Sequence, residues 1–422
     1  MPLQNSTDLA NYLKLFVHKE DNSSGLLSPD GKSTVVEIIE TCGCSIPRYI
    51  NEYWTSRQRQ ASAIHEISYR ACFKPQLARF FIQLLTGEDG LVYDPFSGRG
   101  TTAIEAGLLG RRVIANDINP LSEILCRPRF FIPTLREVEK RLERIPYDNS
   151  LQADIDLSMF FHRQTEAEIV SLKKYLLKRR NEGSEDNLDR WIRMVSTNRL
   201  TGHSPGFFSV YTLPPNQAVT PERQIKINRK RNQIPVYRDT KKLILKKTRS
   251  LIKNLNSAEV ENLRQAGETA LFLQSDARYT PGIPANSVHL TVTSPPFLDV
   301  VQYSKDNWLR CWFNNINTEE IERKITMAGT VEKWSLVMAD VFKELFRITK
   351  NGGAVAFEVG EVKNGAIKLD EYVIELGIKA GFACEGVIIN LQEFTKTSNI
   401  WGVHNNKSGT NTNRIVLFSK KI

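Results

Sequence analysis

Apolar residues in the first third of the chain switch between helical and strand-like spacing. Across 77–85 they recur every three or four residues, as in an amphipathic helix. A short apolar run follows at 90–93, then a glycine-bearing turn, a helical stretch at 102–109 and a second apolar run at 112–116. Short apolar runs bounded by turns are typical of buried strands. The order predicts a strand, helix and strand unit that opens a parallel sheet.

The same alternation returns only after a long interruption. Residues 129–267 are charged, helical in pattern at both ends, and broken in the middle by glycine and proline. Such a stretch is too long for a simple connection, so we expect an inserted region. Further apolar runs follow at 269–273, 287–292, 354–359, 386–391 and 414–418, with a helical pattern at 334–348.

These patterns predict an α/β fold of about seven strands that is interrupted by a long, mainly helical and basic insertion. We expect an N-terminal extension of unknown role at 1–60. The first part of the α/β domain would span 61–128, the insertion 129–267, and the second part 268–422.

Positive charge is concentrated in the insertion. The chain carries a formal net charge of +10, and residues 223–253 hold twelve Lys or Arg against one acid, Asp239. Such a segment favours a polyanionic partner, because each cation that neutralises a phosphate releases counterions. A basic face that serves only solubility is the alternative.

Composition excludes several other classes. No apolar run approaches the roughly 20 residues of a membrane span. The N-terminus lacks the basic start and apolar core of a secretory signal, so we expect an intracellular protein without a membrane partner. The six cysteines are scattered and show no metal-ligand spacing beyond Cys42 and Cys44, so we expect reduced thiols and no metal.

A glycine-bearing turn follows the first predicted strand. An acidic residue ends that strand, two glycines let the backbone turn close to a ligand, and two threonines sit where the next helix begins and could cap it. The turn comprises Asp94, Pro95, Phe96, Gly98, Gly100, Thr101 and Thr102. After the next strand, Asp117 stands where such folds place a carboxylate on ribose hydroxyls. Asp276, after a later strand, is the candidate for contacting an adenine amino group. A nucleotide-type ligand fits this pattern.

A rigid loop follows the strand at 287–292. It consists of Thr293, Ser294, Pro295, Pro296 and Phe297. Adjacent prolines fix the backbone, so that the Ser294 hydroxyl and the Pro295 carbonyl can accept hydrogen bonds in one direction. The ring of Phe297 can stack on a planar group.

Together the glycine turn and the Ser-Pro-Pro-aromatic loop resemble the prokaryotic DNA amino-methyltransferases, which act on cytosine N4 or adenine N6. The resemblance covers roughly residues 61–128 and 269–422. It implies a Rossmann-like fold that binds S-adenosylmethionine at the glycine turn. It also implies catalysis at 294–297 on a base flipped out of double-stranded DNA.

Further details follow from the resemblance. Lys74 and Pro75 would lie near the methionine end of the cofactor, and the insertion would recognise DNA with the help of Arg229, Lys230 and Arg231. A serine before the two prolines is typical of cytosine-N4 enzymes. The sequence departs from the family at Phe297, where tyrosine is commoner, and in the long segment between Asp117 and Asp276.

A restriction-modification setting in the prokaryotic cytoplasm, at the nucleoid through DNA, is implied too. Whether a cognate restriction endonuclease is a partner stays open, as does the oligomeric state. Cytosine C5 chemistry is disfavoured, because no proline is followed by cysteine. Adenine-N6 methylation, RNA amino-methylation and a catalytically silent DNA-binding module remain alternatives.

Overall fold

The structure is a computed structural model of the whole chain. It describes residues 6–17, 33–54, 61–69, 72–214, 218–296, 306–324, 328–362, 367–391 and 412–421.

One large sheet organises the described part of the chain. Its nine strands run in the order β1-β2-β10-β11-β7-β6-β3-β4-β5. Their bounds are β1 Val35–Thr41, β2 Cys44–Asn51, β3 Leu91–Asp94, β4 Arg112–Asn116, β5 Leu271–Leu273, β6 Val288–Thr293, β7 Thr349–Val359, β10 Ala383–Leu391 and β11 Thr412–Ser419. The strands from β7 to β5 are parallel, whereas β11 runs antiparallel to both β7 and β10. A separate pair joins β8 Glu361–Val362 to β9 Ile367–Lys368.

All seven strands that the sequence predicted are in this sheet, but the expected number was too low. The β1–β2 hairpin extends the sheet beyond β10, with β2 parallel to β10. We had assigned no role to residues 1–60. Most of β1 is exposed, so it lacks the alternation of buried and polar positions that marks a strand in sequence.

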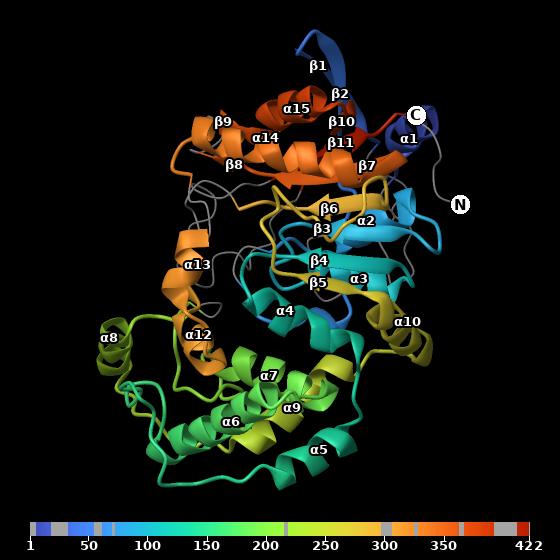
Figure 1. Cartoon of the computed structure of the whole chain (residues 1–422). Helices are drawn as coiled ribbons and strands as arrows, with labels where there is room; N and C mark the ends of the chain where they lie inside the picture. Colours follow the sequence, from blue (N-terminus) through green and yellow to red (C-terminus); the bar gives the residue numbers. More distant parts are fainter. Residues whose placement is uncertain are drawn as a thin grey trace, which may run out of the picture.

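Helices cover both faces of the sheet. One face carries α2 Pro75–Leu85, α3 Thr101–Leu108 and α10 Ser257–Thr269, while α14 Val331–Ile348 and α15 Leu369–Ala380 pack together in a second core cluster. The N-terminal helix α1 Ser6–Leu15 packs at the margin of the sheet (Figure 1), whereas the short turn η2 Ala63–His65 contacts α9 Thr240–Ile252 and η3 Arg127–Phe130 contacts α10 and α7 Asn187–Arg199. No helix among the described residues is long and apolar enough to cross a bilayer.

A helical lobe lies beyond β5. It is built from α5 Leu135–Arg144, α6 Arg163–Asn181, α7 Asn187–Arg199, α8 Pro221–Arg231 and α9 Thr240–Ile252, with α4 Leu121–Cys126 between it and the sheet (Figure 1). After β6 the chain also reaches this lobe, because α12 Trp308–Asn314 packs on α6 and α7 and leads into α13 Thr318–Lys324. By contrast α10, the end of the predicted insertion, packs on α3. We propose that the inserted region ends before α10 and that α10 belongs to the α/β part of the chain.

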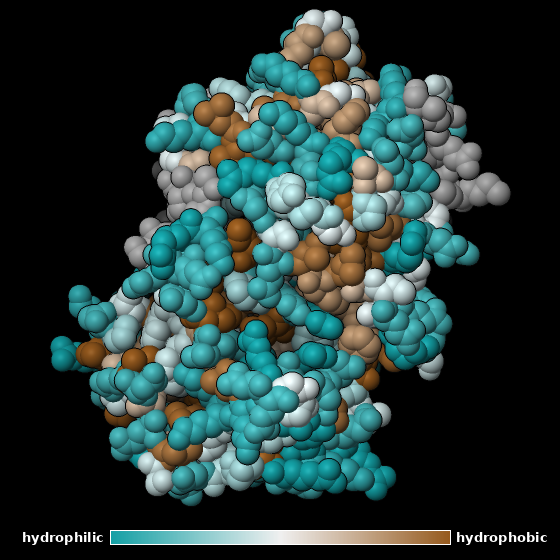
Figure 2. Space-filling model, in the orientation of Figure 1, coloured by the Kyte–Doolittle hydropathy of each residue, from teal (hydrophilic) through white to brown (hydrophobic). Residues whose placement is uncertain are grey.

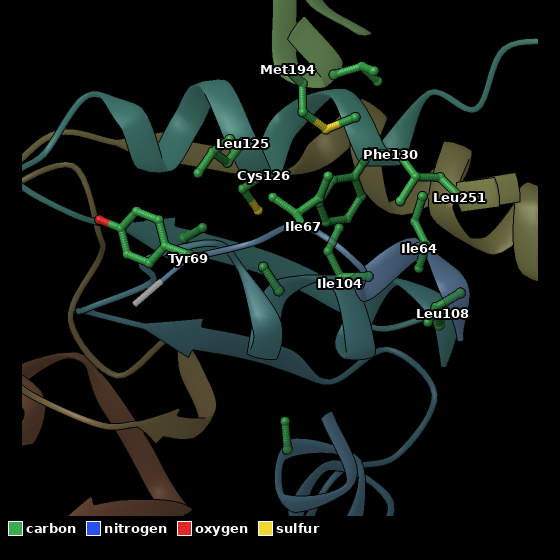
Figure 3. Packing of buried hydrophobic residues seen from close by; sticks show 14 of the residues in the cluster. Ile64, Ile67, Tyr69, Ile104, Leu108, Leu125, Cys126, Phe130, Met194 and Leu251 are labelled. Carbon is green, nitrogen blue, oxygen red and sulfur yellow. The ribbon is translucent and has the colours of Figure 1, made fainter. Parts of the chain in front are cut away.

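The lobe and the sheet share one hydrophobic core. Figure 3 shows Met194 of α7 and Leu251 of α9 beside Phe130 and Cys126, which come from the sheet side. All four are fully buried in the same cluster. Figure 2 shows a largely hydrophilic coat over the lobe, with hydrophobic residues gathered near the middle of the view. Relative motion of the two parts would therefore expose apolar surface.

Candidate active site

A cleft opens at the carboxyl ends of β3, β4, β5 and β6. The chain runs from β3 to β4 on one side, whereas β6 pairs with β3 on the other side. Ligands of open α/β sheets bind at such a reversal of strand order. The cleft is lined by Tyr69, Pro95, Phe96, Gly98, Asp117, Ile118, Asn119, Ser275, Asp276, Ala277, Arg278, Ser294, Pro296, Lys324, Ala328, Trp334, Val337, Met338 and Val341.

The glycine turn depends on its two glycines for different reasons. Gly98 and Gly100 have φ angles of +52° and +82°, which side-chain-bearing residues rarely adopt. A Cβ on Gly100 would also collide with the Cys126 side chain, whereas one on Gly98 would only touch Tyr69. The turn is thus packed between the end of α4, Tyr69 and the cleft.

One expectation about this turn was wrong. Gly100 is the N-cap of α3, and neither Thr101 nor Thr102 caps the helix through its side chain. The Thr102 hydroxyl instead donates to the Val292 carbonyl at 2.9 Å, because the left-handed backbone at Gly100 places both threonines inside the first helical turn. Both threonines are buried, and Thr102 holds α3 against β6.

Asp94 is buried behind the turn. It accepts a hydrogen bond from the Thr293 hydroxyl at 2.7 Å and one from the Phe96 amide at 3.1 Å. Burial raises the pKa of Asp94 to about 7. Asp94 thereby ties the glycine turn to the residue that precedes Ser294.

Asp117 faces the cleft from the end of β4. Its Oδ2 accepts from the Gly98 amide at 2.8 Å, and its Oδ1 accepts from the Asn119 amide at 2.9 Å. A carboxylate offers about four acceptor positions, so two stay open for hydroxyls of a ligand. Burial raises the pKa of Asp117 to about 6.

Asp276 also lines the cleft, and it is paired with a neighbour. The Arg278 Nε lies 3.0 Å from Asp276 Oδ1, and this pairing lowers the pKa of the carboxyl group. The backbone here is held by the Asn116 side chain, whose Oδ1 accepts from the Ser275 amide at 2.9 Å.

The opposite wall of the cleft is apolar and comes largely from α14. Trp334, Val337, Met338 and Val341 line it, and Phe96 contributes from the glycine turn. The indole Nε1 of the buried Trp334 donates to the Pro296 carbonyl at 3.0 Å. One residue therefore contacts the cleft and holds the proline loop. The sequence predicted the helix but not the contact between Trp334 and Pro296, because an apolar pattern shows which face of a helix is buried and not which residues it touches.

Ser294 sits on a buried carboxyl group that sequence analysis also missed. Glu358, in β7, is 8% exposed; its carboxyl group accepts a hydrogen bond from the Asn413 amide at 2.6 Å, and the nearby Ser294 hydroxyl acts to lower its pKa. Burial raises the pKa of Glu358. One signal was available: a single carboxylate at the end of an otherwise apolar strand.

Three further predicted site residues, Lys74, Pro75 and Pro295, are not among those that line this cleft. Lys74 is the N-cap of α2 and Pro75 its first residue, and burial lowers the pKa of Lys74. Pro295 is buried next to Ser294. Phe297 lies outside the described residues, so its stacking role stays a prediction.

Arg229, Lys230 and Arg231 are exposed in the last turn of α8, at the edge of the lobe (Figure 1). The guanidinium carbon of Arg231 lies 3.8 Å from the centroid of the Tyr211 ring. Cations at a helix C-terminus also stabilise the helix dipole, so position alone does not assign them to DNA.

A comparison with protein families matches the part of the chain that contains the glycine turn. Residues 19–123 match the family model of DNA methylases that act on N6 or N4. This match overlaps the expected stretch 61–128 and starts earlier in the chain. The β1–β2 hairpin falls within the matched region.

Two relatives are type II methyltransferases. The chain is 41% identical over 64 residues to M.MvaI of Kocuria varians, which covers 14% of each chain. It is 22% identical over 328 residues to M.BsoBI of Geobacillus stearothermophilus, covering 67% of this chain and 60% of that relative. The chain therefore spans only part of both relatives.

Alignments with solved structures have low TM-scores and low sequence identity. An S-adenosylmethionine-dependent methyltransferase of Methanosarcina mazei has a TM-score of 0.31 at 9% identity, covering 81% of this chain and 97% of the other. An rRNA methyltransferase of Streptomyces viridochromogenes has a TM-score of 0.34 at 11% identity, covering 87% and 94%. At these scores the alignments carry no argument.

The family model matches about a quarter of the chain, so the comparisons show that this chain is similar to DNA methylases over residues 19–123, without separating cytosine N4 from adenine N6.

Proposed function

We propose that this protein transfers a methyl group from S-adenosylmethionine to the exocyclic amine of a base in double-stranded DNA, with cytosine N4 the favoured target. One observation carries the proposal: Ser294 lines the cleft formed by the strand ends, together with Asp117 and the glycine turn, and its hydroxyl influences the pKa of the buried Glu358. The same family includes adenine-N6 enzymes, so the choice of cytosine rests on Ser294.

The cleft fits the cofactor in chemistry and position. Asp117 keeps acceptor positions for ribose hydroxyls, and Phe96 with the apolar residues of α14 can enclose a flat adenine ring. The open backbone at Gly98 leaves room for the rest of the molecule. When bound, S-adenosylmethionine supplies an electrophilic methyl group.

The protein's own part is to orient and activate the amine. An exocyclic base amine is a poor nucleophile, because its lone pair is delocalised into the ring. A Ser294 hydroxyl that donates to Glu358 keeps its oxygen free to accept an amine N–H. Accepting that hydrogen bond leaves more electron density on nitrogen as the bond to carbon forms. The raised pKa of Glu358 favours proton movement from the amine towards the pair of Ser294 and Glu358.

Recognition of DNA falls to the lobe. Its basic segment offers phosphate contacts, and the target base must be rotated out of the duplex to bring its amine to Ser294. A cytoplasmic enzyme at the nucleoid, in a restriction-modification system with or without a cognate endonuclease, is the setting that this proposal implies.

Transfer of labelled methyl groups tests the proposal. The full chain is incubated with labelled S-adenosylmethionine and either duplex DNA of mixed sequence or structured RNA, and the product is digested to nucleosides. We expect label in DNA as N4-methylcytosine. Label in RNA alone, or in neither polymer when cofactor binding is intact, would refute DNA methylation, and N6-methyladenine would refute the choice of cytosine.

A further inference from the structure

A second cavity lies where the sheet meets the lobe, apart from the cleft. Its volume is about 290 Å³. One side is formed by α4, η3 and Gln274, and the other by the end of α6, the following connection and α7. On the sheet side Pro120 directly follows the cleft residue Asn119, and Gln274 directly precedes the cleft residue Ser275.

Charge in this cavity is unbalanced. Four arginines line it, Arg127, Arg180, Arg190 and Arg193, against two carboxylates, Glu123 and Glu185. Arg127 pairs with Glu123 at 2.8 Å, while Arg190 and Arg193 share Glu185 at 3.3 Å and 2.9 Å. Arg180 has no ion-pair partner in the described part of the chain. Two positive charges are therefore in excess.

One arginine that lines the cavity also has a buried donor without a partner. Arg193 is 3% exposed, and its Nη1 makes no hydrogen bond to any described residue. A buried unpaired donor of a charged group costs free energy, so such groups normally have a partner. Burial lowers the pKa of Arg193, and the nearby Arg180 charge acts in the same direction.

We propose that this cavity binds a phosphate group, held by the exposed guanidinium of Arg180 and attracted by the buried positive charge of Arg193 beside it. The planar fork of arginine matches phosphate oxygens with two parallel hydrogen bonds, and a phosphate would cancel the excess charge. The source is either inorganic phosphate or a phosphodiester of bound DNA. Only the second source rests on the proposed function.

Calorimetric titration of inorganic phosphate into the full chain tests the site, with ionic strength held constant by NaCl. We expect saturable binding at one site, and Arg180→Gln should weaken it by at least about tenfold, the effect of one lost charge-assisted hydrogen bond. Arg136→Gln removes the same charge from an exposed position on α5 and should bind as the unaltered chain does. Absence of saturable binding, or equal binding by Arg180→Gln, overturns the proposal.

Duplex DNA then identifies the source. If the phosphate belongs to DNA, Arg180→Gln should reduce the slope of log K against log salt by about one, and Arg136→Gln should not. If both variants keep the slope, the site takes free phosphate. Neither measurement needs methyl transfer, so failure of the proposed activity is separate from failure of this site.

Discussion

At the residue scale, the loop that carries Ser294 and Pro296 is held in place by buried side chains of neighbouring elements. The backbone around Ser294 is held on one side by the hydrogen bond from the Thr293 hydroxyl to Asp94 and on the other by the hydrogen bond from the Trp334 indole to Pro296. Rigid partners keep the reacting groups in place before substrate arrives, which lowers the entropic part of the barrier. The rate of methyl transfer should therefore fall when the single hydroxyl oxygen of Ser294 is removed.

Removal of the Ser294 hydroxyl tests this. Ser294→Ala should slow single-turnover methyl transfer at least about tenfold, the scale of one lost transition-state hydrogen bond of about 1.4 kcal/mol. The dissociation constant for S-adenosylmethionine should change little. Ser257→Ala, an exposed serine on α10, is the control. Equal transfer rates for the Ser294→Ala variant and the unaltered chain would contradict the assigned role.

Asp117 should make cofactor binding depend on pH. Its pKa of about 6 is raised by burial, so protonation below that pH removes acceptor positions for ribose hydroxyls. Affinity for S-adenosylmethionine should therefore fall as the pH drops from 7.5 to 5. In Asp117→Asn binding should be weaker at pH 7.5 and its dependence on pH flatter.

Calorimetry across that range measures the effect, and Asp340→Asn, on the exposed side of α14, is the control. The effect of pH on folding stability runs in the opposite direction to its effect on cofactor binding. The pKa of Asp117 is about 6 in the folded chain, whereas an ordinary aspartate has a pKa of about 4. Asp117 therefore contributes to folding stability fully below about pH 4, and this contribution is lost as the pH rises through about 6. A pH profile unchanged in Asp117→Asn would remove Asp117 from the cofactor site.

At the scale of elements, α8 presents the strongest exposed charge cluster near the edge of the lobe. Replacing Arg229, Lys230 and Arg231 together by Gln should weaken DNA binding and reduce the salt slope by up to about 2.7, since each phosphate contact contributes about 0.9. The matched control replaces Arg136, Lys140 and Arg144 on α5, which are also exposed. Equal slopes for both triple variants would leave the α8 cluster with a helix-stabilising role.

For the whole molecule, the shared core predicts cooperative unfolding of the lobe and sheet. Leu251 is fully buried at their contact. Leu251→Ala should cost about 2–5 kcal/mol and lower a single calorimetric transition. Ile234→Ala, 79% exposed on the lobe, should change stability by less than about 0.5 kcal/mol. Two separate transitions, with only one shifted by Leu251→Ala, would show that the lobe folds alone.

Local signals in the sequence were enough for much of the fold and part of the cleft. All seven predicted strands form, and Asp117, Gly98 and Ser294 do line one cleft. Each follows a strand, and parallel strands bring their carboxyl ends to one edge. The threonine caps failed because Gly100 took the cap position, a choice made by backbone conformation.

What the sequence determined by itself is the order of strands and helices and the residues that follow each strand, because apolar spacing and turn residues act over a few positions. Tertiary structure alone decided which distant residues meet. Glu358 lies 64 positions after Ser294, and β2 pairs with β10 more than 330 residues later. Such contacts arise when burial brings separate elements together, and no local pattern of residues encodes their partners.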